Sequence, residues 1–197
     1  MVYGHKSEDW DLLRVRINIV RQNRMNISFF IECKSIPDFL SHWGKSYYDE
    51  EWKYDNNIGK PLTEQSRLEL FEWKNGSRIA PKKLDSIRSN YPLAFNGDLK
   101  NRYLNTNGSG GAIWNIFYMH CIDRSRYPIY DQHTYRAMRY IQTGKIDEIS
   151  DRKSIIYSTY QNDYIPFVNS LKEADQRKID KALFSFGQFL KKAKKYV

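Results

Sequence analysis

The sequence contains little cysteine and no long apolar run. Only two cysteines, Cys33 and Cys121, occur in 197 residues, which is too few for a thiolate zinc site or an iron–sulfur cluster. In a reducing cytosol we expect both to be free, buried thiols. The longest apolar run, about five residues around Ile27 to Ile31, is far shorter than the roughly 20 residues of a membrane helix. The first residues also lack a secretory apolar segment, so we expect a cytoplasmic, intracellular protein with no membrane partner.

Acidic residues are outnumbered by basic ones, 23 Asp and Glu against 32 Lys and Arg, which gives a net charge of +9. Such an excess indicates a polyanionic partner, most commonly nucleic acid; the alternative is a basic surface that serves solubility. The hydrophobic fraction of 41% and the aromatic fraction of 15% exclude a disordered chain. The length fits one domain, or two small lobes that share a core.

The first third of the chain differs from the rest. Polar and β-branched residues alternate over residues 14–19, and apolar residues alternate again over residues 27–31. This period of two predicts a β-hairpin over residues 13–33; a helix is the alternative there. We therefore divide the chain into an accessory hairpin segment, residues 1–35, and a helical domain, residues 36–197, without a firm boundary.

The rest of the sequence is helical in pattern. Thr63 is a suitable N-cap and Asn75-Gly76 a suitable stop, so Trp73-Lys74 is interpreted as a helix end. Apolar residues at spacings of three and four predict an amphipathic final helix, after a capping box formed by Ser170 and Glu173. The predicted helices span residues 38–43, 64–75, 81–90, 93–104, 111–122, 132–142, 151–161 and the final segment through Leu190, with a long loop at 45–60.

A glycine-rich turn precedes the most apolar of these helices. Three glycines fall in four positions in Asn107-Gly108-Ser109-Gly110-Gly111. This spacing predicts a tight hairpin whose free backbone N–H groups, together with the helix dipole, bind a phosphate oxygen. An ordinary flexible turn is the alternative. A nucleotide P-loop is excluded, because no Gly-Lys-Ser/Thr follows.

Asp131 follows a proline-containing turn at the head of another predicted helix. Aspartate is a favoured N-cap, and its carboxylate can accept hydrogen bonds from the amides of His133 or Thr134. The alternative is a functional carboxylate at a cleft beside the glycine hairpin. The sequence leaves both interpretations open.

These segments together resemble a known family. Gly108-x-Gly110, the helix that follows it, and a second helix headed by Asp131-x-His133 are similar to the helix-hairpin-helix/Gly-Pro-Asp superfamily of DNA glycosylases. The spacing is closest to that of its 8-oxoguanine glycosylase branch, and the similarity covers residues 105–140. The resemblance implies a mainly α (α+β), two-lobed helical glycosylase-like fold, with the helix-hairpin-helix turn at residues 105–111 and the small N-terminal β-hairpin as an addition.

The resemblance also implies a reaction in base-excision DNA repair. Asp131 would be the catalytic carboxylate, which stabilises positive charge on the sugar as the glycosidic bond breaks and orients the attacking water. The target nucleotide would be flipped out of damaged double-stranded DNA into an aromatic and apolar pocket, with no metal and no cofactor. The expected phosphate-binding residues are Gly108, Ser109, Gly110, Gly111, His133 and Arg136. The expected base-pocket residues are Ala112, Asn115, Ile116, Met119, His120 and Tyr130.

Helical spacing divides the helix after the hairpin into two faces. Asn115, Ile116, Met119 and His120 share one face with Ala112, and the family arrangement turns that face toward Asp131. Positions Ile113, Phe117 and Cys121 are expected in the core. Arginine and lysine residues surround this segment and fit a phosphate-neutralising surface, although a solvated surface explains each one individually. This set consists of Lys100, Arg102, Arg124, Arg126, Arg136 and Arg139.

Two features depart from the family pattern. Bifunctional members carry a lysine shortly after the hairpin, where this chain has Ala112, so lyase chemistry from that position is excluded. The family's Leu-Pro before the first glycine is replaced by Thr106-Asn107. The sequence therefore predicts a monofunctional, nucleoid-associated DNA N-glycosylase. The alternatives are a non-catalytic helix-hairpin-helix DNA-binding module and a helical protein-interaction domain.

Overall fold

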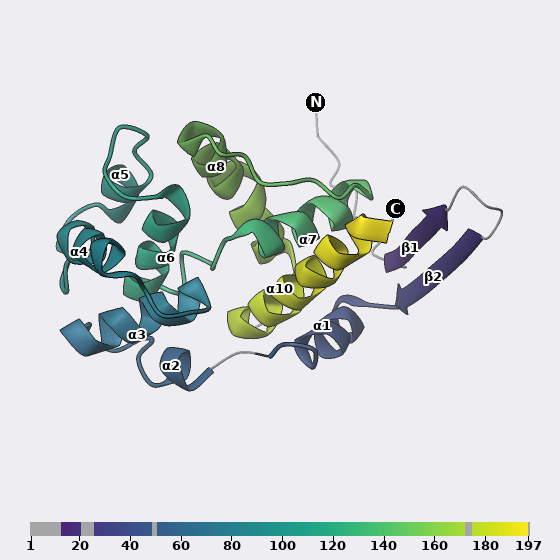
Figure 1. Ribbon diagram of the computed structural model, residues 1–197, viewed down its shortest axis with the longest axis horizontal. Helices are drawn as coiled ribbons and strands as arrows, with labels where there is room; N and C mark the ends of the chain where they lie inside the picture. The colour runs from purple at the N-terminus through teal and green to yellow at the C-terminus, as the bar shows by residue number, and fades with distance from the viewer. Residues whose placement is uncertain (1–12, 21–25, 49–50, 172–174, 197) are drawn as a thin grey trace, which may run out of the picture.

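The structure is a computed structural model that describes residues 13–20, 26–48, 51–171 and 175–196, and within these ranges the side chains of residues 32–195. It is mainly helical, with one two-stranded sheet (Figure 1). Strands β1 (Leu13–Val20) and β2 (Asn26–Cys33) pair antiparallel, and Leu13 lies opposite Cys33. The predicted β-hairpin is thereby confirmed. In Figure 1 it extends away from the helices at one end of the molecule.

Helices form the rest of the described chain. Their bounds are α1 (Ile36–Gly44), α2 (Glu51–Asp55), α3 (Glu64–Asn75), α4 (Pro81–Asn90), α5 (Leu99–Tyr103), α6 (Ala112–Ile122), α7 (Gln132–Thr143), α8 (Lys153–Thr159), the π-helical η1 (Tyr160–Tyr164), α9 (Ile165–Ser170), α10 (Gln176–Ala193) and the 3₁₀-helical η2 (Lys194–Tyr196). In Figure 1, α2 to α6 gather at one end, whereas α1, α7 and α10 lie between them and the β-hairpin.

Local sequence signals define most helix ends. Thr63 caps α3, with its side chain accepting a hydrogen bond from the amide of Ser66, and Gly76 ends that helix in the left-handed region at φ 66°. Gly144 ends α7 in the same way at φ 68°. Pro81 begins α4, where its missing N–H costs nothing. These predicted boundaries are confirmed.

Four predictions of secondary structure need correction. The segment 45–60 is not a continuous loop, because it contains α2. The helix expected over residues 93–104 is reduced to α5, which Asp98 caps. The helix expected over residues 151–161 ends at Thr159 in α8 and continues as the π-helical η1.

The fourth correction concerns the capping box expected at Ser170 and Glu173. Ser170 instead closes α9, donating a hydrogen bond to the carbonyl of Phe167. Glu173 lies outside the described residues. The N-cap of α10 is Asp175, whose carboxylate accepts from the amide of Arg177.

Helix α10 packs along α7 and α1. Its predicted apolar stripe is confirmed: Ile179, Ala182, Leu183, Phe186 and Leu190 are all buried. Cys33 and Cys121 are both free, buried thiols, as expected. Within the described part of the chain, no helix is both long and apolar enough to cross a membrane.

Candidate functional site

A cavity of about 530 Å³ opens where the end of α3, the start of α6, the start of α7 and the middle of α10 meet. Aromatic and apolar side chains form much of its wall, among them Trp73, Trp114 and Phe184. Its charged and polar lining includes Lys74, Asp131, His133 and Asp180. The size falls within the roughly 300–1,000 Å³ of small-molecule pockets.

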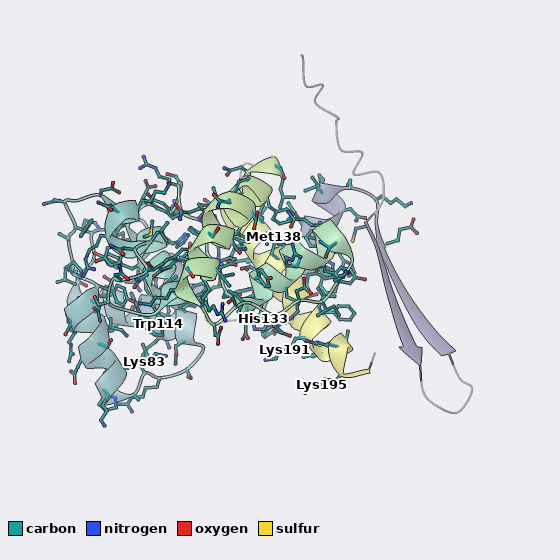
Figure 2. All side chains as sticks on the ribbon, turned by 90° about the horizontal axis from the view of Figure 1, so that it is seen from above. Lys83, Trp114, His133, Met138, Lys191 and Lys195 are labelled. Carbon is teal, nitrogen blue, oxygen red and sulfur yellow. The ribbon has the colours of Figure 1, made fainter. Side chains whose placement is uncertain are left out.

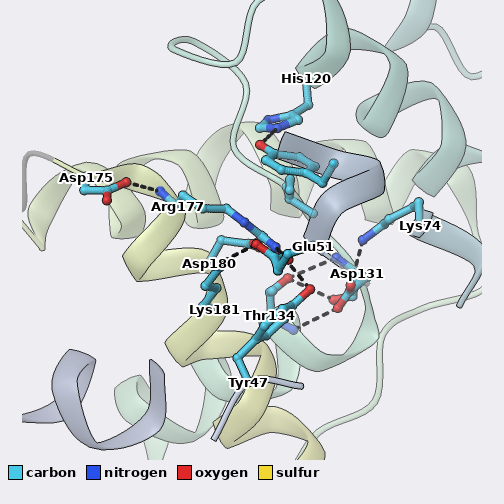
Figure 3. A network of polar contacts seen from close by, with 12 residues as sticks. Tyr47, Glu51, Lys74, His120, Asp131, Thr134, Asp175, Arg177, Asp180 and Lys181 are labelled. Atoms are coloured by element: carbon cyan, nitrogen blue, oxygen red, sulfur yellow. Dashed lines mark hydrogen bonds and ion pairs between the residues drawn. The ribbon is translucent and has the colours of Figure 1, made fainter. Parts of the chain in front are cut away.

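Asp131 lies at the wall of this cavity and also caps α7 (Figure 3). Its Oδ1 accepts hydrogen bonds from the backbone amides of His133 at 2.7 Å and Thr134 at 3.0 Å. Its Oδ2 accepts from the ammonium of Lys74 at 2.7 Å. Only 14% of the Asp131 side chain and 8% of the Lys74 side chain are exposed. Asp131 is therefore both an N-cap and a cavity-facing carboxylate.

Its surroundings hold Asp131 in the ionised form. Burial by itself would raise the pKa of the carboxyl, but the charge and hydrogen bond of Lys74 and the amide of Thr134 outweigh it, and the pKa lies below its ordinary value. The first turn of α7 adds the positive end of the helix dipole. The cavity thus contains a fixed anion whose two oxygens are both oriented by donors.

A second charged cluster surrounds Arg177 of α10 (Figure 3). Its guanidinium pairs with Glu51 at 2.5 Å and with Asp180, and it lies over the rings of Tyr54 and Trp73. Such cation–π contacts stabilise a buried guanidinium. The cluster connects α2 and α3 to α10.

Asp180 separates the main cavity from a smaller one of about 260 Å³, which His120 and Arg177 also line. Burial raises the pKa of Asp180 to about 6, against the opposing charge of Arg177. Burial likewise lowers the pKa of His120 to about 3, so this imidazole is neutral; it contacts Tyr54 Oη at 2.7 Å and the carbonyl of Tyr127 at 2.7 Å. The main cavity therefore has two carboxyl groups of different acidity.

The glycine hairpin connects α5 to α6. The buried side chain of Asn115 holds it in place by hydrogen bonds. The Asn115 amide donates to the carbonyls of Tyr103 and Ser109 and accepts from the hydroxyl of Tyr91 at 2.8 Å. Gly110 lies directly above it at φ 81°, where an added Cβ would be 2.3 Å from Asn115 Oδ1. Only glycine fits both that backbone angle and that space.

The outer side of the hairpin faces solvent. Ser109 and Gly111 are exposed, and no side chain caps the first turn of α6. Lys153 of α8 donates to the carbonyl of Gly108 at 2.7 Å, and Arg102 contacts Ser109 Oγ at 3.4 Å. The uncapped N–H groups of α6 and the two nearby cations are the features of an anion-binding turn.

The expected base-pocket residues lie elsewhere. Asn115, Ile116, Met119 and Tyr130 are fully buried in the core and do not line the main cavity, and Ala112 and His120 are nearly so. The residues of α6 that line the cavity are Ile113 and Trp114. The face assignment of this helix is therefore wrong, since the positions expected to face Asp131 are buried, whereas Ile113, expected in the core, lines the cavity. Helix α6 is apolar on every side and buries both faces.

The prediction that Arg136 binds a DNA phosphate is wrong, because the residue is buried. Its side chain is 1% exposed, donates to the carbonyl of Gly187 at 3.0 Å and pairs with Glu148 at 2.6 Å. Its buried guanidinium therefore links α7 to α10 and to the segment before α8. His133 does line the cavity, where burial lowers its pKa, partly opposed by the charge of Asp131.

Among the surrounding basic residues, Lys100, Arg102, Arg124 and Arg126 are exposed, and Arg139 pairs with Asp147 at 3.2 Å. Figure 2 shows Lys83 beside Trp114, and the ammonium of Lys83 lies 4.2 Å from the centre of that ring. The same view places Lys191 and Lys195 toward the end of α10. Lys83 contacts two residues that line the cavity, Trp114 and Asn75, but does not line it itself.

Sequence reasoning missed several residues at the cavity. Lys74 was interpreted as part of a helix end, and Tyr47 lies in the segment expected to be a loop. Asp180 and Phe184 line the cavity from α10, four residues apart and beside the apolar stripe. A carboxylate within such a stripe is the signal that identifies them, since a buried charge needs a partner.

Among the described residues, no group of three or more His, Cys, Asp or Glu side chains is placed to hold a metal ion. No protein-family model, curated protein or solved structure matches the chain.

Proposed function

We propose that the chain is a DNA-binding base-excision protein, an N-glycosylase that hydrolyses the bond between a flipped-out base and its deoxyribose. The observation that carries this proposal is the ionised carboxylate of Asp131 at the wall of a 530 Å³ cavity. As the glycosidic bond breaks, positive charge develops on the sugar, and a fixed anion in a buried site stabilises it strongly. The same carboxylate can orient the attacking water.

The cavity wall suits a flipped base. Trp73 and Trp114 offer aromatic surfaces for stacking. The indole N–H of Trp73 is buried and has no hydrogen-bond partner within the described part of the chain. A mixed wall of this kind binds a planar ring with polar edges.

The glycine hairpin supplies the contact to the DNA strand in this proposal. In this proposal the exposed turn at Ser109 and the start of α6, whose first turn no side chain caps, offer backbone N–H groups to the strand, and such groups bind a phosphate without reading the base sequence. The net charge of +9 favours the same partner. A two-lobed, glycosylase-like arrangement would place this turn beside the strand whose base enters the cavity.

A non-catalytic helix-hairpin-helix DNA-binding module is the second candidate. It is favoured by the ion pair of Asp131 with Lys74, because every polar contact of the carboxylate is then satisfied without a substrate. In that case the Asp131 carboxylate is structural only.

Asp131→Asn tests the two candidates. Asparagine keeps the N-cap and removes the charge, so we expect base release from duplexes carrying modified bases to fall about 100-fold or more. DNA affinity, measured by anisotropy at several salt concentrations, should stay within about threefold, because no phosphate contact is changed. Asp175→Asn, the same substitution at the N-cap of α10, is the matched control and should leave base release unchanged.

If the wild-type protein releases none of the modified bases but binds DNA in a salt-sensitive way, it is the non-catalytic module instead. A protein that ignores DNA even at low salt would contradict both candidates and favour a protein-interaction domain.

A further inference from the structure

The two faces of the β-hairpin differ sharply in composition. Successive residues of a strand belong to opposite faces of a sheet, and the register pairs Ile17 of β1 with Phe29 of β2. The face that contains this pair consists of apolar residues throughout: Leu13, Val15, Ile17 and Ile19 from β1, and Ile27, Phe29, Ile31 and Cys33 from β2. The opposite face is mainly polar and includes Arg14, Arg16, Asn18, Asn26, Ser28 and Glu32.

The base of the hairpin shows how these faces lie relative to the protein. Cys33, on the apolar face, is 2% exposed and belongs to the hydrophobic core, whereas Glu32, on the polar face, is exposed. Strand β2 packs against α1. In both Figure 1 and Figure 2 the two strands then extend away from the described helices. The apolar face therefore begins in the core and continues outward beyond the helices.

A face of this kind requires a second apolar layer. A two-stranded hairpin is at best marginally stable in water, and packing of its apolar face is what stabilises it. Each copy of the chain has a net charge of +9, yet the apolar face contains no charged residue. Two copies related by a two-fold axis can therefore meet through this face without bringing charges together, with Arg14 and Arg16 on the outer faces.

The area of the face suits a dimer. Burying one aliphatic or aromatic side chain removes roughly 60–120 Å² of apolar surface from water. For the seven residues of the face beyond Cys33 this amounts to about 400–800 Å² per copy. Specific interfaces bury about 800 Å² on each partner, and the smallest about 500 Å². The hairpin face alone therefore reaches the size of a specific interface.

We propose that the apolar face of the β-hairpin is a dimer interface, which packs face to face on the same hairpin of a second copy across a two-fold axis. The product is a small sandwich of two two-stranded layers about 10 Å apart. This inference does not rest on the proposed function, because the cavity is lined from the helical domain. Each copy of the dimer keeps its own cavity.

Sedimentation velocity of the full chain at roughly 1–200 µM tests the proposal, since mass action makes a dimer depend on concentration. We expect the mass to rise from 23.6 kDa to about 47 kDa over this range. Phe29→Lys places a charge on the apolar face and should raise the dissociation constant about 100-fold or more. Phe30→Lys is the matched control, because the next residue along a strand lies on the opposite face; this variant should dimerise like the wild type.

Three outcomes of this experiment overturn the proposal. The first is a wild-type protein that stays monomeric at every concentration. The second is growth beyond the dimer, which indicates pairing along strand edges instead of faces. The third is an equal effect of Phe29→Lys and Phe30→Lys, because the interface would then not follow the apolar face.

Hydrogen exchange of the wild-type protein makes the test independent of whether Phe29→Lys folds. The second layer stabilises the hairpin, so the amides of β1 and β2 should exchange about tenfold more slowly at ten times the dissociation constant than far below it. The amides of α7 should exchange at the same rate at both concentrations. Hairpin exchange that does not change with protein concentration overturns the proposal.

Discussion

Gly187 of α10 lies against the first turn of α7, the turn that Asp131 caps. A Cβ at Gly187 would lie 2.0 Å from the carbonyl oxygen of His133 and 2.6 Å from its carbonyl carbon. Ordinary contact begins at 3.4 Å, so the first distance is 1.4 Å too short. Both clashing atoms belong to the backbone, and therefore Gly187→Ala must push the two helices apart rather than rotate a side chain.

The size of the effect follows from two opposing contributions. Overpacking a tight interface costs about 1–3 kcal/mol, and a rigid backbone clash belongs at the upper end. Alanine recovers about 1 kcal/mol of helix propensity relative to glycine. The net loss for Gly187→Ala is therefore about 2 kcal/mol, which lowers the melting temperature of a chain of this size by roughly 4–8 °C.

Thermal unfolding followed by circular dichroism measures this loss. Gly44→Ala is the matched control, since Gly44 closes α1 and an added Cβ there meets nothing within 4 Å; it should be neutral or slightly stabilising. A Gly187→Ala protein that melts at or above the wild-type temperature would refute the close approach of α7 and α10, and with it the placement of Asp131 at the cavity.

Two further predictions concern the site. The pKa of Asp131 is lowered below the ordinary value of 3.8, so folding favours its ionised form. Its contribution to stability is therefore present above pH 3.8 and is lost as the pH falls through the pKa of the folded state. The difference in unfolding free energy between wild type and Asp131→Asn, measured with urea, should shrink as the pH falls from about 5 to below about 4; a difference that grows over this range would contradict the ion pair. Asn115→Leu should lower the unfolding free energy by about 2–3 kcal/mol, because it leaves the Tyr91 hydroxyl and the Ser109 carbonyl without this partner. Amide hydrogen exchange at residues 104–111 should become faster. Exchange at the wild-type rate would show that the hairpin keeps its conformation without Asn115.

Local chemistry explains which parts of the fold were predictable. The ends of α3, α4 and α7 depend on Thr63, Pro81 and Gly144, residues that act on the neighbouring backbone: Thr63 accepts a hydrogen bond with its side chain, Pro81 lacks an N–H, and Gly144 adopts a left-handed conformation. The stripe of α10 was predictable because only one of its faces is apolar. Helix α6 has apolar residues all round, so periodicity could not decide which of its faces meets the cavity.

Long-range pairing explains most of what could not be predicted. Lys74 and Asp131 are 57 residues apart in sequence, and no local pattern associates them. Arg136 looks like a surface arginine on α7, and only the packing of α10 places the Gly187 carbonyl beside it. Buried polar residues acquire their roles from partners that the fold brings to them.

The capping role and the functional role of Asp131 are compatible because a carboxylate has two oxygens. Oδ1 is held by the amides of His133 and Thr134, and this fixes the direction of Oδ2, which accepts from the buried ammonium of Lys74. An N-cap therefore orients the anion at the cavity wall instead of competing with it. A substitution that removes the cap also removes the anion, so Asp131→Ala would lose both stability and activity and distinguish nothing. Asparagine separates the two roles, since it retains the acceptor toward the backbone and takes the negative charge from the cavity.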